Sequence, residues 1–220
     1  MLDIELLEPA VARALAVVGA RLGAEPGLPW LLAGEAAVAM QAVAMQRAPE
    51  SLLLITGAPE LGRVAALLAA DEREPLASRS APGYAASPRG IYELEGIAID
   101  LVGDAVATGK AGELSLALEH VWPLRVERRA GDARVPLLPL EIELAVALLQ
   151  GQGDYAHAIA DHLLATGVRW ERLDDVLAAL PALEQPLWEL MDRVRPLAKR
   201  ARSRRARQQL GWGQGQKKRK

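Results

Sequence analysis

The sequence predicts an α/β (α+β) protein in which a short mixed sheet flanked by helices is followed by a helical domain. Three observations support this prediction. Apolar runs with strand character alternate with amphipathic helical stripes over residues 1–139. Over residues 140–198 the apolar residues recur only at helical spacing. The last segment, 199–220, is basic and polar, and we expect it to be a disordered tail.

The expected elements of the first domain follow from local patterns. Apolar residues three and four positions apart predict a first helix over 2–23, which Pro26 and Gly27 end. A region rich in Ser, Pro and Gly predicts an exposed loop over 71–90. The other expected elements are a strand at 30–33, a glycine turn at Gly34, a helix at 35–47, a strand at 51–55, a helix at 59–70, a bulged strand or a hairpin at 91–102, a strand at 121–129, a turn at 131–132 and a strand at 135–138.

The second domain is expected to consist of four helices. Their apolar residues, among them Leu173, Val176 and Leu180, lie on one helical face in each segment. The expected ranges are 140–150, 154–165, 170–180 and 183–198.

Composition excludes several classes of protein. The 220 residues include no cysteine, which rules out disulfides, thiolate zinc sites and a cysteine nucleophile. The chain starts with acidic residues where a secretory signal would carry basic ones, and no apolar run reaches the length of a membrane span. We therefore expect a cytoplasmic protein without a membrane partner.

Charge is distributed unevenly along the chain. The segment 199–220 has ten basic residues and no acidic one, which leaves 16 basic and 28 acidic residues for 1–198. An acidic body argues against a broad nucleic-acid surface on the folded part. The tail could instead contact the phosphates of RNA, bind a protein partner or fold back on its own body.

The stretch Ser51–Val64 resembles the outline of a phosphate-binding loop but lacks its chemistry. The basic position is Arg63 rather than lysine, and Val64 replaces the hydroxyl that would bind magnesium. Pro59 removes an amide donor, and Glu60 would repel phosphate. Both residues suit the first turn of a helix, so the glycine spacing is interpreted as helix entry.

A different resemblance extends over most of residues 28–180. The segments Trp30-Leu-Leu-Ala-Gly-Glu-Ala-Ala-Val38, Arg47-Ala-Pro-Glu-Ser-Leu-Leu-Leu-Ile55, Gly96-Ile-Ala-Ile-Asp-Leu-Val102 and Val135–Gln150 are similar, in order and spacing, to the nucleotidyltransferase superfamily with the polymerase-beta palm fold. The similarity is to its minimal and antibiotic-type members. It implies the α/β domain and the helical domain predicted above.

The resemblance also implies a site that is degenerate in this chain. In the family, a glycine turn admits a nucleoside triphosphate, and three carboxylates on two strands hold magnesium. Gly34 matches the first glycine, but Glu35 replaces the second small residue. Ser51 and Leu53 stand where two of the carboxylates are expected, and Asp100 matches the third.

Asp100 can be interpreted in two ways. An aspartate inside an apolar strand is costly if buried without a partner, which favours a role in a site. It could equally lie on a solvated sheet face and pair with an arginine. Arg79 and Arg89 precede it in the chain and could reach an anionic ligand across the cleft, or could be ordinary surface charges.

The leading hypothesis is a nucleotidyltransferase-like protein that has lost catalysis and binds a nucleotide, a small anionic ligand or a partner. Its candidate ligand-binding residues are Gly34, Glu35, Ser51, Arg79 and Arg89. A first alternative is an active nucleotidyltransferase with divergent metal ligands, in which acids at positions 35 and 100 hold magnesium or manganese; without such activity no cofactor is expected. A second alternative is an RNA-associated scaffold that binds through its tail.

Overall fold

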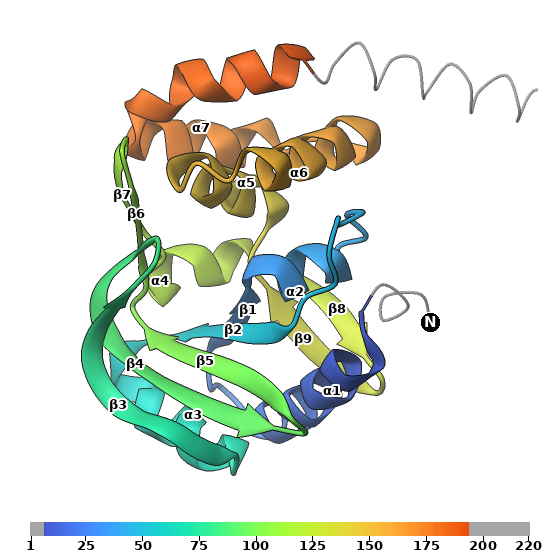
Figure 1. Ribbon diagram of the computed structural model, residues 1–220, viewed down its shortest axis with the longest axis vertical. Coiled ribbons are helices and arrows are strands. Elements are labelled where there is room, and N and C mark those ends of the chain that lie inside the picture. Colours follow the sequence, from blue (N-terminus) through green and yellow to red (C-terminus); the bar gives the residue numbers. More distant parts are fainter. Residues whose placement is uncertain (1–6, 194–220) are drawn as a thin grey trace, which may run out of the picture.

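The structure of the chain is a computed structural model that describes residues 7–193 (Figure 1). It contains a nine-stranded mixed sheet with helices on both faces. The helices are α1 (Pro9–Gly23), α2 (Gly34–Met40), α3 (Leu61–Leu68), α4 (Leu118–Val121), α5 (Leu140–Leu149), α6 (Gly153–Thr166), α7 (Trp170–Ala179) and a last helix, 184–193, that reaches the end of the described residues. The strands are β1 (Trp30–Ala33), β2 (Ser51–Thr56), β3 (Asp71–Ala81), β4 (Tyr84–Leu94), β5 (Ile97–Gly103), β6 (Val106–Gly109), β7 (Gly112–Ser115), β8 (Val126–Ala130) and β9 (Ala133–Leu137).

The strand order places β2 and β5 at the centre of the sheet. The order is β7-β6-β4-β5-β2-β1-β9-β8, and β3 extends the sheet by pairing with β4. β2 runs parallel to β5 and antiparallel to β1, whereas β4 is antiparallel to β5. Ala33 at the end of β1, Leu53 of β2 and Asp100 of β5 are therefore side by side across the sheet.

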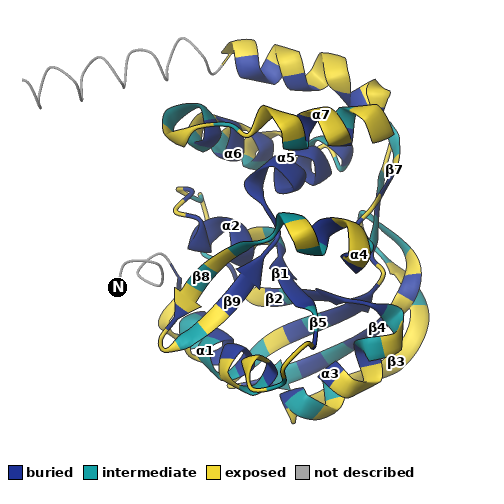
Figure 2. Ribbon diagram, turned by 180° about the vertical axis from the view of Figure 1, so that it is seen from behind, coloured by how far each residue is buried: buried dark blue, intermediate teal, exposed yellow. Residues whose placement is uncertain are grey.

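Helices cover the two faces of the sheet separately. α1 and α3 pack on one face, with Leu52 and Leu54 of β2 in the core between them. α5 lies on the other face (Figure 1), where its residues Ile142 and Val146 belong to the same apolar cluster as Leu31 of β1. A third cluster joins α2, α5, α6, α7 and the last helix. Of the helices after residue 140, α5 and α7 thus share an apolar cluster with the sheet, and α5 is buried on nearly all sides (Figure 2).

Several predicted elements are confirmed. The strand at 30–33 with its glycine turn, the strand at 51–55 and the helices that start near 140, 154, 170 and 183 are present. Of the two alternatives at 91–102, the hairpin is confirmed, because Glu95 and Gly96 have the positive φ angles of a tight turn. The helix expected at 2–23 starts only at Pro9, so the described residues 7 and 8 are not helical as expected. Residues 2–6, the helix end expected at 198 and the tail lie outside the described residues.

Three predictions about local structure are wrong. Residues 71–90 form the long hairpin of β3 and β4 rather than a loop. The side chains of β3 are almost all exposed, so the strand shows no apolar alternation and is held by pairing with β4. The strand expected at 121–129 starts at Val126, because Pro123 lies in a helical turn, and the helix expected at 35–47 ends at Met40.

The stretch that resembles a phosphate-binding loop enters a helix. β2 ends at Thr56, a 3-10 turn spans Ala58–Glu60 and α3 follows. The amide of Ala58 donates to Asp104 Oδ2 at 3.2 Å, so one of the chain's own carboxylates faces the loop amide. Within residues 7–193, none of the helices has the length and apolar character needed to cross a membrane.

The substitution Gly62→Ala tests whether this glycine spacing is incidental. A Cβ on Gly62 would meet no atom within 4 Å, and the residue lies inside α3. We expect the free energy of unfolding to rise by up to about 1 kcal/mol, because alanine has the higher helix propensity. Urea denaturation measures the change. Gly57→Ala is the comparison, with no gain expected, because its Cβ would meet the carboxylate of Glu60. A loss of stability in Gly62→Ala would contradict the helix-entry interpretation.

Candidate functional site

The candidate site lies on the α5 side of the sheet, where the end of β1 meets β2 and β5. Leu53 pairs in register with Asp100 on one side and with Ala33 on the other, so these residues share a face. Ser51 is exposed and Leu53 is half-buried on this face. A serine and a leucine therefore occupy the β2 positions where the resemblance expects two carboxylates.

Asp100 and Arg89 form a two-pronged ion pair. Arg89 Nε donates to Asp100 Oδ1 at 2.5 Å, and Arg89 Nη2 donates to Asp100 Oδ2. The antiparallel register of β4 and β5 sets Ile91 opposite Asp100, which places Arg89 diagonally across from the carboxylate. The arginine side chain is 9% exposed and the aspartate side chain 24%. Of the two interpretations of Asp100, the structure thus shows pairing with an arginine.

The surroundings of Arg89 reinforce its fixed position. Its guanidinium carbon lies 5.9 Å from the centre of the Tyr84 ring, within cation–π range. Its third nitrogen, Nη1, is buried and has no hydrogen-bond partner among the described residues. Arg89 therefore directs two of its nitrogens to Asp100 inside a nearly closed environment.

Gly34 has an internal carboxyl group on its amide. The glycine has a φ angle of +69°, a backbone conformation that residues other than glycine rarely adopt. Its N–H donates to Glu143 Oε1 at 2.6 Å. A Cβ at this position would lie 3.7 Å from the side chain of Leu53, so the turn closes directly onto β2. Glu143, from α5, thus binds the amide that begins α2.

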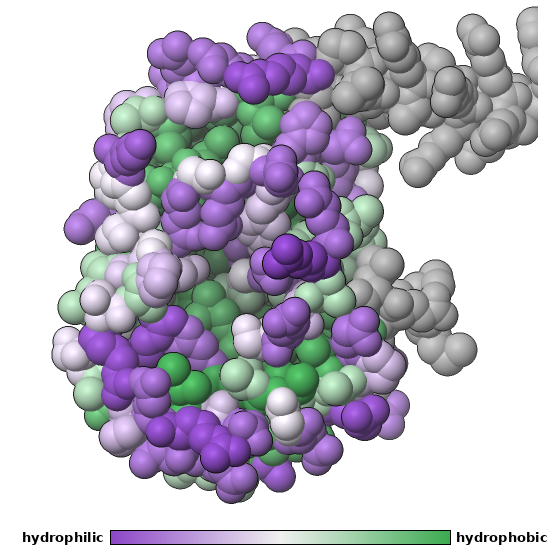
Figure 3. All heavy atoms as spheres, in the orientation of Figure 1, coloured by the Kyte–Doolittle hydropathy of each residue, from purple (hydrophilic) through white to green (hydrophobic). Residues whose placement is uncertain are grey.

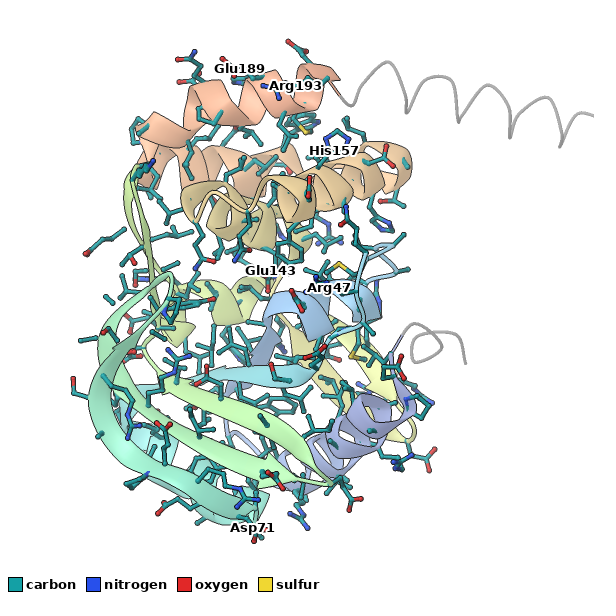
Figure 4. All side chains as sticks on the ribbon, in the orientation of Figure 1. Arg47, Asp71, Glu143, His157, Glu189 and Arg193 are labelled. Carbon is teal, nitrogen blue, oxygen red and sulfur yellow. The ribbon has the colours of Figure 1, made fainter. Side chains whose placement is uncertain are left out.

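Glu143 is buried at the boundary between the sheet and the helices (Figure 4). Burial raises its pKa to about 8, and the hydrogen bond from Gly34 opposes this shift. At neutral pH the carboxyl group is therefore mostly protonated. Burial, and next the charge of Glu143, raise the pKa of Tyr84 and of Tyr155. The hydroxyl of Tyr155 is also buried without a hydrogen-bond partner among the described residues.

A pocket of about 240 Å³ opens beside this site, between α2 and the start of α6. Glu35, Arg47 and Asp154 give it mixed charge, and Tyr155 contributes one wall. The other lining residues are Met45, Gln46 and Ala158. Ligand pockets typically have roughly 300–1,000 Å³, so this one suits a compact ligand or a single side chain.

The described residues do not fit the two-metal centre that the resemblance implies. Within residues 7–193 no group of three or more His, Asp or Glu side chains is placed to hold a metal ion. Asp100 is already paired with Arg89, and Glu35 lies in the pocket between α2 and α6. The donor set needed for magnesium is therefore missing from this face of the sheet.

The predicted site residues are brought together only in part. Arg89 and Asp100 are in contact, and Gly34 adjoins Leu53. Ser51 lies at the exposed end of the same face. Arg79 instead pairs with Glu74 on β3 and donates to the Pro75 carbonyl at 2.5 Å.

Sequence reasoning missed Glu143 and the two tyrosines. Glu143 follows Glu141 by two residues in an apolar helical run, and both glutamates are buried. Acidic side chains are almost never fully buried without a partner, so two of them in such a run were a usable signal. Glu141 finds its partners in the amide of Arg169 at 3.1 Å and the guanidinium of Arg172 at 3.5 Å.

Comparison with known proteins supports the fold. Among solved structures, the chain is similar to a putative nucleotidyltransferase from Thermotoga maritima, with a TM-score of 0.58 and 18% sequence identity. The similarity covers 74% of this chain and 98% of that protein. No protein-family model and no curated protein matches the sequence. At this identity the similarity shows the fold alone, and the chain has a nucleotidyltransferase-like fold.

Proposed function

We propose that this protein with a nucleotidyltransferase-like fold is non-catalytic and acts as a binding module. The observation that carries the proposal is the ion pair of Arg89 and Asp100, with Leu53 beside it. Nucleotidyl transfer in the family depends on metal ions held by several carboxylates. In this chain the guanidinium of Arg89, rather than a metal ion, supplies the positive charge beside Asp100, the one carboxylate that matches the family.

The energetics disfavour a metal ion at this position. Two unit charges at about 4 Å repel by about 4 kcal/mol near a protein surface, and a divalent ion doubles this cost against Arg89. Three carboxylates would offset such a cost, but Ser51 and Leu53 contribute none. The alternative of an active enzyme with acids at positions 35 and 100 as ligands has no described metal-binding group to support it.

Glu143 supplies a second argument against a bound triphosphate. The glycine turn would have to offer its amide to a phosphate, and Glu143 Oε1 already accepts from Gly34 at 2.6 Å. Glu35 adds a negative charge in the first turn of α2. The chain's own side chains would thus compete with both a metal ion and a phosphate group at this site.

The proposed binding site is the mixed-charge pocket between α2 and α6. Its size favours a compact polar ligand or one side chain of a partner over a nucleoside triphosphate. Arg47 offers one positive charge in its wall, and the charged residues Glu35 and Asp154 offer negative ones. Arg47→Gln should therefore weaken the binding of any ligand that a thermal-shift assay detects. Arg63→Gln should not, because Arg63 lies in α3, away from this pocket. Equal affinity in both variants would exclude this pocket.

A gain-of-function variant tests the loss of the metal site. The triple variant Ser51→Asp, Leu53→Asp, Arg89→Ala places two new carboxylates beside Asp100 and removes the guanidinium that pairs with it. Positions 51 and 53 are not fully buried, so the new acids can remain hydrated. By calorimetry we expect Mn²⁺ to bind this variant at least about tenfold more tightly than the wild type, a difference of about 1.4 kcal/mol.

The matched control carries Ser51→Asn, Leu53→Asn and Arg89→Ala, which has the same shapes without the added charges. It should bind Mn²⁺ no better than the wild type. A wild-type protein that already binds Mn²⁺ as tightly as the carboxylate variant would overturn the proposal.

A further inference from the structure

Two tryptophans stack on the outside of the helical region. Trp170 begins α7 and Trp188 lies in the last helix; their ring centres are 5.7 Å apart and their planes differ by 19°. They remain 39% and 38% exposed, and among the large apolar side chains of residues 7–193 only Leu76 shares this exposure. Stacked indoles in water present an aromatic surface that the core does not use.

An acidic groove adjoins this aromatic pair. It has a volume of about 450 Å³ and includes Trp188, Glu184, Glu189 and Asp192 among its lining residues. Between Trp170 and Arg193 there are six acidic and two basic residues. Glu189 lies on the outermost helix, whose outer side is hydrophilic, and apolar residues show between this helix and those beneath it (Figures 3 and 4).

We infer that this aromatic and acidic groove is the docking site for the chain's own basic segment, residues 199–220. Charge complementarity supports this occupant, because the segment has ten basic residues and no acid, whereas residues 1–198 have twelve more acidic than basic ones. Arginine guanidinium groups, which supply six of these charges, also stack on tryptophan faces.

Connectivity favours docking within one chain. The last helix carries part of the groove and is itself the element from which the chain continues at residue 194. A covalent link raises the effective concentration of the segment at the groove to the millimolar range for short linkers. The docked segment would make the tail unavailable to RNA until a competing polyanion displaced it. This inference does not depend on the pocket between α2 and α6.

Zero-length cross-linking of the full chain tests the inference. A carbodiimide joins lysine amines to carboxylates in contact, and outside the segment the chain has only one lysine, Lys110. Mass spectrometry should find residues 217–220 joined mainly to Glu184 and Glu189. Raising NaCl from about 0.05 to 0.5 M should reduce these products severalfold, because screening weakens exposed charge pairs. Mixing isotope-labelled and unlabelled protein shows whether a product lies within one chain.

Variants of the aromatic pair provide the control. Trp170→Ala, Trp188→Ala should lower the yield of these cross-links, whereas Leu76→Ala, which removes the other exposed large apolar side chain, should not. Circular dichroism checks that the variants stay folded. Cross-links spread evenly over the acids of the body, cross-links between chains, or a yield unchanged by the tryptophan substitutions would each overturn the inference. So would a tail whose lysines react with no body carboxylate.

Discussion

Replacing Asp100 by asparagine is expected to lower the free energy of unfolding by about 3 kcal/mol, because it leaves the guanidinium of Arg89 buried without a counter-charge. The arginine side chain is 9% exposed and cannot recover its hydration. Arg89→Gln should cost less, about half as much, since the 24% exposed aspartate can remain partly solvated. Urea denaturation at pH 7 measures both changes.

The double variant Asp100→Asn, Arg89→Gln completes the test. If the two charges stabilise each other, the double variant should lose less stability than the sum of the losses in the two single variants. An acid retained for binding or catalysis often lowers stability, so its removal would be neutral or stabilising. A stable Asp100→Asn protein would therefore contradict a structural role for the ion pair.

Replacing Glu143 by glutamine is expected to stabilise the protein at alkaline pH. The pKa of Glu143 is raised from 4.5 to about 8 in the folded state, so folding takes up a proton between these values. The wild type consequently loses stability as pH rises from 4.5 to 8, by up to about 1.4 kcal/mol per pH unit. Glutamine keeps an acceptor for the Gly34 amide without the charge, so the variant should lack this loss and exceed the wild type by a few kcal/mol at pH 9.

Denaturation at a series of pH values measures this effect as the difference between variant and wild type. Glu141→Gln is the matched control, since Glu141 is equally buried but pairs with Arg172. That change should destabilise the protein through loss of its ion pair. A difference between Glu143→Gln and wild type that does not grow with pH would show that the glutamate is not held protonated.

Much of the fold could be predicted from local sequence patterns. The glycine turn after 30–33 and the amphipathic helices after residue 140 depend on residues close together in the chain. The hairpin of β3 and β4 could not be predicted, because the exposed side chains of β3 resemble those of a loop and its order comes from pairing with β4. Tertiary pairing of this kind leaves no periodic signal.

The candidate site was predictable only where a residue conflicts with its surroundings. Asp100 is an acid within an apolar strand, and Leu53 is an apolar residue where the resemblance expects an acid, so both could be identified from the sequence. The partnership of Arg89 depends on strand register, which the sequence does not specify. Glu143 contacts Gly34 across 109 positions of the chain, and an acid in the first turn of a helix is usually interpreted as a favourable surface charge.

Titration of the full-length wild-type protein with ATP, in the presence and absence of Mg²⁺ or Mn²⁺, tests the central claim most directly. Calorimetry should show no triphosphate binding that depends on the metal ion, because Asp100 is paired with Arg89 and the Gly34 amide with Glu143. Metal-dependent binding of ATP that Asp100→Ala abolishes would contradict this account and would support an active nucleotidyltransferase site.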